Sequence, residues 1–339
     1  MSLRDAIEQA VQRQELSSAL LESAFGEIMA GDASELQIAA LLVALRTKGE
    51  TVDEIVGAAR ALRAAAVTAP CLDPRTVDTC GTGGDGAGTF NISTTAAFVV
   101  AGAGVPVAKH GNRAASSKTG SIDVLEALGV AVDLPVEAAA ELVAEVGIGT
   151  FFARRAHPAM RFVAPVRQAL GIRTLMNCMG PLLNPLGVRH QVIGVYAEDL
   201  VPRIGEALAR LGTARALVVH GLDGLDEITT TTRTRAAFVE GESVSGLEID
   251  PEALGVPLAV SEALAGGSAE ENARITRAVL EGETGPRRDI VVLNAAAALW
   301  AAGAADDLAA GLELARESLD SKQALGKLVA LAAASQAKA

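Results

Sequence analysis

The sequence predicts an α/β fold in which a group of helices precedes a largely parallel sheet. Three observations support this prediction. The first 67 residues have helical periodicity with capping signals, a proline-bracketed linker follows at 70–74, and short β-rich segments then alternate with Ala-rich helices. The chain has 339 residues, of which 50% are hydrophobic, so it can bury one large core or two ordinary ones.

The N-terminal helices are recognised by their ends. Ser34 and Gln37 have the spacing of a capping box, and the pattern recurs at 51–54. Gly31 and Gly49 stand where C-terminal caps are expected.

The helix between these two glycines is apolar on more than one face, through Leu36, Ile38, Leu41, Leu42, Val43 and Leu45. Such a helix packs either inside the protein or against a second copy of the chain. We expect Leu41 and Leu42 to face a second copy.

Beyond the linker, five segments are predicted as strands joined by helical crossovers: 76–80, 105–109, 192–196, 216–220 and 290–293. Residues 151–185 depart from this pattern and are predicted as loop, helix and loop. We expect this segment to return to the N-terminal helices before the sheet resumes.

The composition of the chain narrows the range of possible functions. The formal net charge is −12, the isoelectric point is near 4.9 and only 3% of residues are aromatic, which argues against a general nucleic-acid binder. The three cysteines have no zinc or disulfide spacing and are expected to be reduced in a cytoplasmic protein. The N-terminus is not a signal peptide and no apolar run is long enough to span a membrane, so a soluble protein is expected.

The segment 78–86, Asp-Thr-Cys-Gly-Thr-Gly-Gly-Asp-Gly, predicts a site for a phosphorylated ligand. Glycines let backbone N–H groups approach an anion closely. The 37 residues from Gly86 to Ile122 contain no acid but include Lys109, Arg113 and Lys118. Cations are therefore concentrated beside the glycines.

A dinucleotide site is the first alternative for this segment, because Gly81, Gly83 and Gly86 fit G-x-G-x-x-G. A dinucleotide-binding fold has an acidic residue about 20 positions after the glycine loop, whereas the first acidic residue after Asp85 is Asp123. The N-cap-type cluster 91–95 comes first instead, and a helix N-terminus there would bind a terminal phosphate.

Two further groups are expected at the carboxyl edge of the sheet, because each follows a predicted strand. The basic loop 109–121 offers Lys109, Asn112 and several hydroxyls to an anion. The adjacent carboxylates of Asp226 and Glu227 suit Mg²⁺, which combines one or two protein carboxylates with phosphate oxygens and water. His157 is a weaker candidate.

Together these motifs resemble the anthranilate phosphoribosyltransferases of tryptophan biosynthesis. The resemblance covers nearly the whole chain and includes the block around Arg167 and the sequence Gly-Pro-Leu-Leu-Asn-Pro at 180–185. The glycine loop and Lys-His-Gly at 109–111 are also similar to the pyrimidine nucleoside phosphorylases. The block around Arg167 and the acidic pair favour the anthranilate enzymes.

The resemblance implies a nucleoside phosphorylase/phosphoribosyltransferase-like fold. Its parts would be a small helical, dimerising domain at 1–70, joined by helices from about 155–185, and a larger α/β domain at 71–339 with a mostly parallel sheet. It also implies a homodimer. The implied reaction transfers the 5-phosphoribosyl group of phosphoribosyl pyrophosphate to the amine of anthranilate and releases pyrophosphate, with Mg²⁺, two ions per subunit.

The resemblance also implies roles for residues, position by position. The metal would be bound by Ser93, Asp226 and Glu227, and anthranilate by Gly81, Asn112 and Arg167. No residue is assigned as an acid or base. The phosphoribosyl donor would be bound by Gly81, Gly84, Asp85, Thr89, Asn91, Ile92, Ser93, Thr94, Lys109, His110, Gly111, Asn112, Arg113, Ala114, Ala115, Ser116, Ser117 and Ser121.

Two alternatives stay open from the sequence. A nucleoside phosphorylase-like enzyme would release the base from thymidine or uridine in the presence of phosphate. A non-catalytic paralogue that binds nucleic acid would be basic or would lack the glycine and acidic motifs, and neither is seen here.

Overall fold

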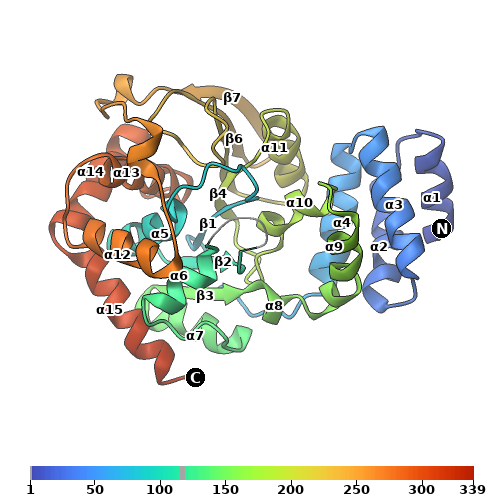
Figure 1. Ribbon diagram of the computed structural model, residues 1–339, viewed down its shortest axis with the longest axis horizontal. Helices are drawn as coiled ribbons and strands as arrows, with labels where there is room; N and C mark the ends of the chain where they lie inside the picture. The colour runs from blue at the N-terminus through green and yellow to red at the C-terminus, as the bar shows by residue number, and fades with distance from the viewer. Residues whose placement is uncertain (1, 115–118) are drawn as a thin grey trace.

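The computed structural model describes residues 2–114 and 119–339, and its first part is a layer of helices (Figure 1). The two predicted capping boxes are confirmed at the starts of α3 and α4, and Gly31 ends α2 with a φ of 86°. The helices of this layer are α1 (Leu3–Val11), α2 (Ser18–Ala30), α3 (Glu35–Lys48) and α4 (Val52–Ala64).

The segment after β3 lies against this N-terminal layer (Figure 1). Its α9 contacts α3, its first 3₁₀ helix contacts α2, and the side chains of Val163, Val166 and Leu175 belong to the same apolar core as α1–α4. The segment consists of α8 (Ala153–Ala156), η1 (Pro158–Phe162), α9 (Ala164–Leu170), α10 (Met176–Met179) and η2 (Gly180–Leu183).

The prediction for α3 is wrong about which side chains face outward. Leu41 and Leu42 are fully buried within the single chain, because α3 packs its broad apolar face on α1 and α9. Leu36 and Val43 point away from this core and are 83% and 37% exposed. The apolar stripe available to another molecule is therefore narrower than the sequence indicated.

The rest of the chain builds a seven-stranded sheet in the order β3-β2-β1-β4-β5-β6-β7. The first five strands in this order are parallel and the last two are antiparallel, so the expected mostly parallel sheet is confirmed. The strands are β1 (Val77–Gly81), β2 (Val107–Gly111), β3 (Ile148–Phe152), β4 (His190–Gly194), β5 (Arg215–Gly221), β6 (Thr234–Glu240) and β7 (Ser243–Ile249).

One predicted strand is wrong and three strands were not predicted. Residues 290–293 lie inside α13 (Pro286–Ala301), a helix buried on nearly all sides, whose β-branched start looks like a strand when only composition is considered. The missed strands are β3 and the antiparallel pair β6 and β7. The last of these is an edge strand with mostly exposed side chains.

Helices cover both faces of the sheet, so successive side chains of an inner strand are buried in cores on opposite sides of it. In β4, Val192 packs with α5 (Ile92–Gly102) and α13, whereas Ile193 packs in the core shared with α11 (Leu200–Arg210). The remaining elements are α6 (Ser121–Ala127), α7 (Val136–Val146), α12 (Ala269–Leu280), α14 (Leu308–Asp320), α15 (Gln323–Gln336), η3 (Glu252–Leu254) and η4 (Ser261–Leu264).

The single tryptophan lies in this α/β part. The Trp300 ring, near the end of α13, stacks on Phe238 of β6 with ring centroids 4.5 Å apart and planes 7° from parallel. The guanidinium of Arg215 lies 5.3 Å from the centroid of the Phe238 ring. Within the described ranges, no helix combines the length and apolar character needed to cross a bilayer.

Candidate active site

The site lies at the carboxyl edge of the sheet, where the chain order reverses between β1 and β4. Both strands end in a glycine, Gly81 and Gly194, which are register partners. A Cβ added to either glycine would lie far inside van der Waals contact with Asp226. The absence of two side chains therefore makes room for the acidic pair at the point where parallel α/β sheets bind ligands.

The glycine loop, defined here as residues 82–88, follows β1 with four glycines in the left-handed region. The φ values of Gly83 and Gly84 are 68° and 80°. The Gly83 N–H donates to Asp226 Oδ2 at 2.7 Å, and Asp85 Oδ2 accepts from the Asp226 N–H at 3.5 Å. The loop thus folds back over one of the two adjacent carboxylates.

The N-terminus of α5 receives the other carboxylate. The Ser93 N–H donates to Glu227 Oε1 at 3.1 Å, as expected for an anion at a helix N-terminus. Asn91 is the N-cap residue but makes no capping bond with its side chain, because its Oδ1 accepts from Asn272 at 2.9 Å. Thr94 is buried in the first turn of α5. The N-cap-type cluster at 91–95 therefore forms the N-cap and first turn of α5.

Lys109 brings a buried positive charge beneath the loop. Its ammonium donates to the Thr79 carbonyl and lies 3.5 Å from Ser93 Oγ. Behind it, the buried Asp78 accepts from the His110 N–H and from Asn184. Burial raises the pKa of Asp78, and the nearby positive charge of Lys109 opposes that shift.

The acidic pair carries more negative charge than its surroundings balance. Burial, followed by the charges of Asp85 and Glu227, raises the pKa of Asp226 well above its ordinary value. Burial raises the pKa of Glu227 to about 7, against the effect of Lys109. A cation bound here would relieve this repulsion.

The acids do not form a complete metal cage by themselves. Within residues 2–114 and 119–339, no group of three or more acidic, histidine or cysteine side chains is arranged to hold a metal ion. The two carboxylates accept hydrogen bonds from different elements: Asp226 from the Gly83 N–H of the glycine loop, and Glu227 from the Ser93 N–H of α5. This donor set fits an ion that takes its other ligands from phosphate oxygens and water, as Mg²⁺ does.

The basic loop is only partly available to an anion. Arg113 donates to Asp123 at 2.8 Å and to Glu126 at 2.7 Å, so carboxylates of α6 already neutralise its charge. Ser121 Oγ donates to the Asn112 carbonyl at 3.4 Å. Of the residues predicted in this loop, Ala115, Ser116, Ser117 and Lys118 lie outside the described residues.

Two histidines lie beside the helical layer. The rings of His110 and His157 meet edge to face with centroids 5.2 Å apart, and neither Nε2 has a partner among the described residues. Burial lowers the pKa of His110 to about 3 and that of His157 to about 4. Both rings are therefore neutral near pH 7.

Arg167 lies on α9, on the helical-layer side. It is partly buried, and desolvation lowers the pKa of its guanidinium. Its side chain makes no hydrogen bond or ion pair within the described part of the chain. A half-buried cation with no protein partner is suited to a carboxylate ligand.

Sequence reasoning missed two residues at this edge. Asn184 bonds both to the Asp78 carboxylate and to the Ala108 carbonyl, and Arg173 donates to the carbonyl of Gly84. Both side chains come from the 153–184 segment. Asn184 belongs to the block at 180–185 that carries the resemblance, although no role was predicted for it, whereas the only signal for Arg173 was its position in a segment rich in Arg and Pro.

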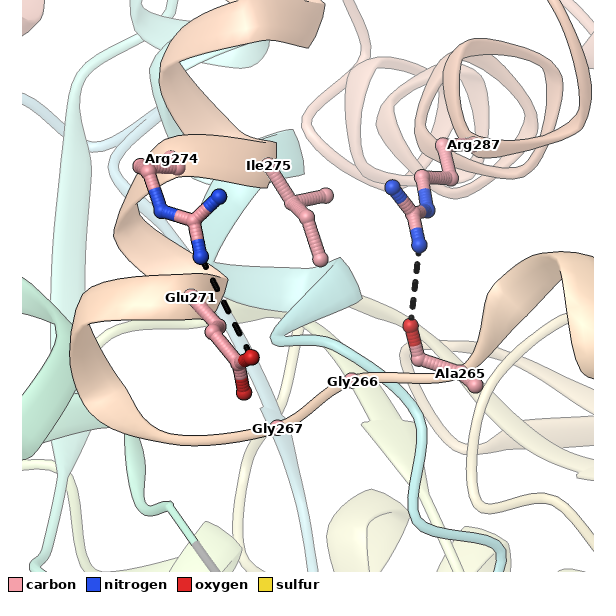
Figure 2. A pocket seen from close by; sticks show the side chains of 7 residues that line it. All are labelled: Ala265, Gly266, Gly267, Glu271, Arg274, Ile275 and Arg287. Atoms are coloured by element: carbon pink, nitrogen blue, oxygen red, sulfur yellow. Dashed lines mark hydrogen bonds and ion pairs between the residues drawn. The ribbon is translucent and has the colours of Figure 1, made fainter.

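One cavity outside this site is lined by other residues. It has a volume of about 280 Å³ and lies between the turn at 265–267, α12 and Arg287 (Figure 2). Both of its arginines already have partners in the protein. Arg274 Nη2 lies 4.0 Å from Glu271 Oε1, and Arg287 donates to the Ala265 carbonyl. Gly266 bonds to Gly88, so this turn supports the end of the glycine loop from outside.

Fold and site together define a two-part glycosyltransferase. The model for the glycosyl transferase family helical bundle domain matches residues 4–66, and the model for the a/b domain of that family matches residues 73–325. The chain is 53% identical over 331 residues to the anthranilate phosphoribosyltransferase of Moorella thermoacetica, covering 98% of each sequence. It belongs to the anthranilate phosphoribosyltransferase family.

Solved structures agree with this assignment. The anthranilate phosphoribosyltransferase from Thermus thermophilus aligns with a TM-score of 0.93 and 45% identity, covering 98% of this chain and 99% of that one. The Saccharomyces cerevisiae enzyme, solved in complex with PRPP and Mg, aligns with a TM-score of 0.90 and 27% identity over 99% and 98% of the two chains.

Proposed function

We propose that this site transfers the 5-phosphoribosyl group of phosphoribosyl pyrophosphate to the amine of anthranilate, giving N-(5-phosphoribosyl)anthranilate and pyrophosphate in tryptophan biosynthesis. One observation carries the proposal. The glycine loop, the start of α5 and Lys109 surround two carboxylates whose charge the described residues do not balance. That combination suits a pyrophosphate together with its metal ion.

The donor is proposed to lie along the glycine loop and the start of α5. The residues that support this placement are Gly81, Gly84 and Asp85 in and before the loop, and Ser93 and Lys109 beneath it. His110, Gly111, Asn112, Ala114 and Ser121 border the same edge of the sheet, whereas the participation of Arg113 requires it to leave Asp123 and Glu126.

Asp226, Glu227 and Ser93 are proposed to hold Mg²⁺, two ions per subunit. The fit rests on the raised pKa of both carboxyls and on their oxygen-only chemistry. When bound, the ion neutralises the charge that develops on the departing pyrophosphate. The relative from Saccharomyces cerevisiae that was solved with PRPP and Mg supports this choice of ion.

The chain's own residues would act mainly by position and charge. As pyrophosphate leaves, C1 of the ribose becomes positive, and the amine must be held in line with it. The N–H groups of the glycine loop and the ammonium of Lys109 would stabilise the leaving group. His110 is neutral at pH 7 and is not proposed as an acid, and an arylamine attacking a cationic carbon needs little base catalysis before the bond forms.

An assay of the purified protein tests this proposal. With phosphoribosyl pyrophosphate, Mg²⁺ and anthranilate present, we expect the fluorescence of anthranilate to fall, and omission of either substrate to abolish the change. Release of the base from thymidine or uridine with phosphate, without loss of anthranilate, would instead support the nucleoside phosphorylase alternative.

The acceptor is proposed to lie between the two parts of the chain, with Arg167, Asn112 and Gly81 around it. The yeast relative has been solved in complex with 4-fluoroanthranilate, a close analogue of the acceptor; it is 26% identical, with a TM-score of 0.88. The guanidinium of Arg167, which has no partner among the described residues, would bind the carboxylate with two donors.

Arg167→Ala is expected to raise the Michaelis constant for anthranilate by about tenfold or more, because one charge-assisted interaction of roughly 1.5–3 kcal/mol is lost. The constant for phosphoribosyl pyrophosphate should change little. Steady-state kinetics with each substrate varied in turn measures both. Arg161→Ala, an exposed arginine on the neighbouring η1, is the control. Equal effects on the two substrates would argue against a carboxylate contact.

A homodimer through the helical layer is also proposed, as is a cytoplasmic location. The exposed Leu36 and Val43 on α3 support the first, and the free thiols of Cys71, Cys80 and Cys178 support the second.

Leu36→Asp with Val43→Asp is expected to yield folded monomers, whose melting temperature falls only by the contribution that dimerisation makes to stability. In a dimer these charges would be buried without partners, whereas in the single chain both side chains already face solvent. Light scattering gives the mass, and Val329→Asp, on the exposed face of α15, controls for an added charge. A double variant that remains dimeric would place the interface elsewhere.

A further inference from the structure

Arg173 connects the helical layer to the glycine loop. It lies between α9 and α10, next to Thr174 and the fully buried Leu175, which packs in the core of the N-terminal helices. Its Nη2 nevertheless donates to the Gly84 carbonyl at 2.6 Å. The two residues are 89 positions apart, so the contact ties two distant parts of the chain together.

The guanidinium of Arg173 is held from a second side. It lies over the ring of Tyr196, 4.3 Å from the ring centroid, and the Tyr196 N–H donates to Thr82 Oγ1 at 3.1 Å. A stacked guanidinium loses less freedom when it forms a hydrogen bond than an unsupported one does. Tyr196 and Arg173 therefore hold the glycine loop at its start and at its tip.

The contact fixes the direction of a specific N–H group. Across the trans peptide that joins the two residues, the Gly84 carbonyl and the Asp85 N–H point in opposite directions. With the carbonyl on Arg173, the Asp85 N–H points away from the arginine. The N–H groups of Gly84, Asp85 and Gly86 donate to none of the described residues and remain available to an anion.

We propose that Arg173, stacked on Tyr196, is a positioning residue for the phosphorylated donor: it holds the Gly84–Asp85 peptide so that the loop presents its N–H groups to the pyrophosphate. This inference rests on the proposed function. Arg167, six residues earlier on the same segment, would contact the acceptor directly. Arg173 acts on the donor through the loop.

Replacement of Arg173 by methionine tests the proposal, because methionine keeps the aliphatic stem but removes the donors and the charge. Arg173→Met is expected to raise the Michaelis constant for phosphoribosyl pyrophosphate about tenfold and to change that for anthranilate less than about twofold. Inorganic pyrophosphate with Mg²⁺ should bind about tenfold more weakly in a calorimetric titration. Arg189→Met is the matched control, since it removes another arginine-to-glycine-carbonyl bond, to Gly212, at a remote place.

Arg173→Lys separates positioning from charge. Lysine keeps the charge but lacks the planar fork, so the donor constant should stay raised by about fivefold or more. Full recovery with lysine would overturn the proposal in favour of simple attraction between charges. An equal rise in both Michaelis constants would overturn it as well.

Hydrogen exchange separates this inference from the proposed function. Without any substrate, the hydrogen-bonded amides of Thr82, Gly83 and Ala87 should exchange faster in Arg173→Met than in the unsubstituted protein, whatever reaction the enzyme catalyses. Unchanged exchange would overturn the role of Arg173 and leave the transferase assignment intact. An unsubstituted protein without transferase activity would refute the function and leave the exchange result standing.

Discussion

Asp226→Asn combined with Glu227→Gln is expected to lower turnover on the order of 100-fold or more at limiting Mg²⁺ while the protein stays folded. The amides keep an oxygen that can accept from the Gly83 and Ser93 N–H groups, but they lose the charge that would bind the ion. Because the pKa values of both carboxyls are raised in the folded protein, removal of their charges should leave the melting temperature equal or higher.

A neighbouring acidic pair supplies the control for this double variant. Glu198 and Asp199 follow β4, are exposed, and pair with Arg235 and Arg203. Glu198→Gln with Asp199→Asn makes the same change in net charge and should leave turnover and its Mg²⁺ dependence unaltered. Full activity of the Asp226 and Glu227 variant at limiting Mg²⁺ would remove this pair from the metal site.

Gly81→Ala is expected to reduce turnover by at least about tenfold with little loss of stability. The new Cβ would overlap the carboxylate of Asp226, which can rotate away but then loses its bond to the Gly83 N–H and its place in the proposed metal site. Steady-state kinetics over a range of Mg²⁺ concentrations, together with a thermal melt, measures both effects.

Gly194→Ala provides the contrast, because its Cβ would overlap the backbone of Asp226, which cannot rotate away. We expect destabilisation of about 3 kcal/mol or more from this overpacking. A Gly81→Ala variant that loses as much stability as Gly194→Ala would show that the first glycine serves the fold and not the position of the carboxylate.

The inner strands and the N-terminal helices could be predicted because each leaves a local signal. β1, β2, β4 and β5 are short segments that contain valine and end in glycine, and helices α3 and α4 carry capping boxes. Residues 290–293 could not be assigned in this way, since a helix buried on all sides has no periodicity to distinguish it from a buried strand. β7 was missed because an exposed edge strand is largely polar.

The candidate site could be predicted as a set of residues but not as a set of contacts. Glycines, Lys109 and the acidic pair are visible in order along the chain. Which carboxylates neutralise Arg113, and which loop group Asp226 bonds, depends on how helices and strands pack. Arg173 carries no motif, and only the fold brings it to Gly84.

Because Trp300 lies in the α/β part, where its ring stacks on Phe238, tryptophan fluorescence reports on this part of the chain alone. The helices at 3–64 contain neither tryptophan nor tyrosine, and the single tyrosine, Tyr196, also belongs to the sheet region. Emission from Trp300 should therefore follow the melting of the sheet and of α13. It should not change when only the helical layer unfolds. Combined with circular dichroism, which records all helices, it would reveal whether the two parts unfold together or one after the other.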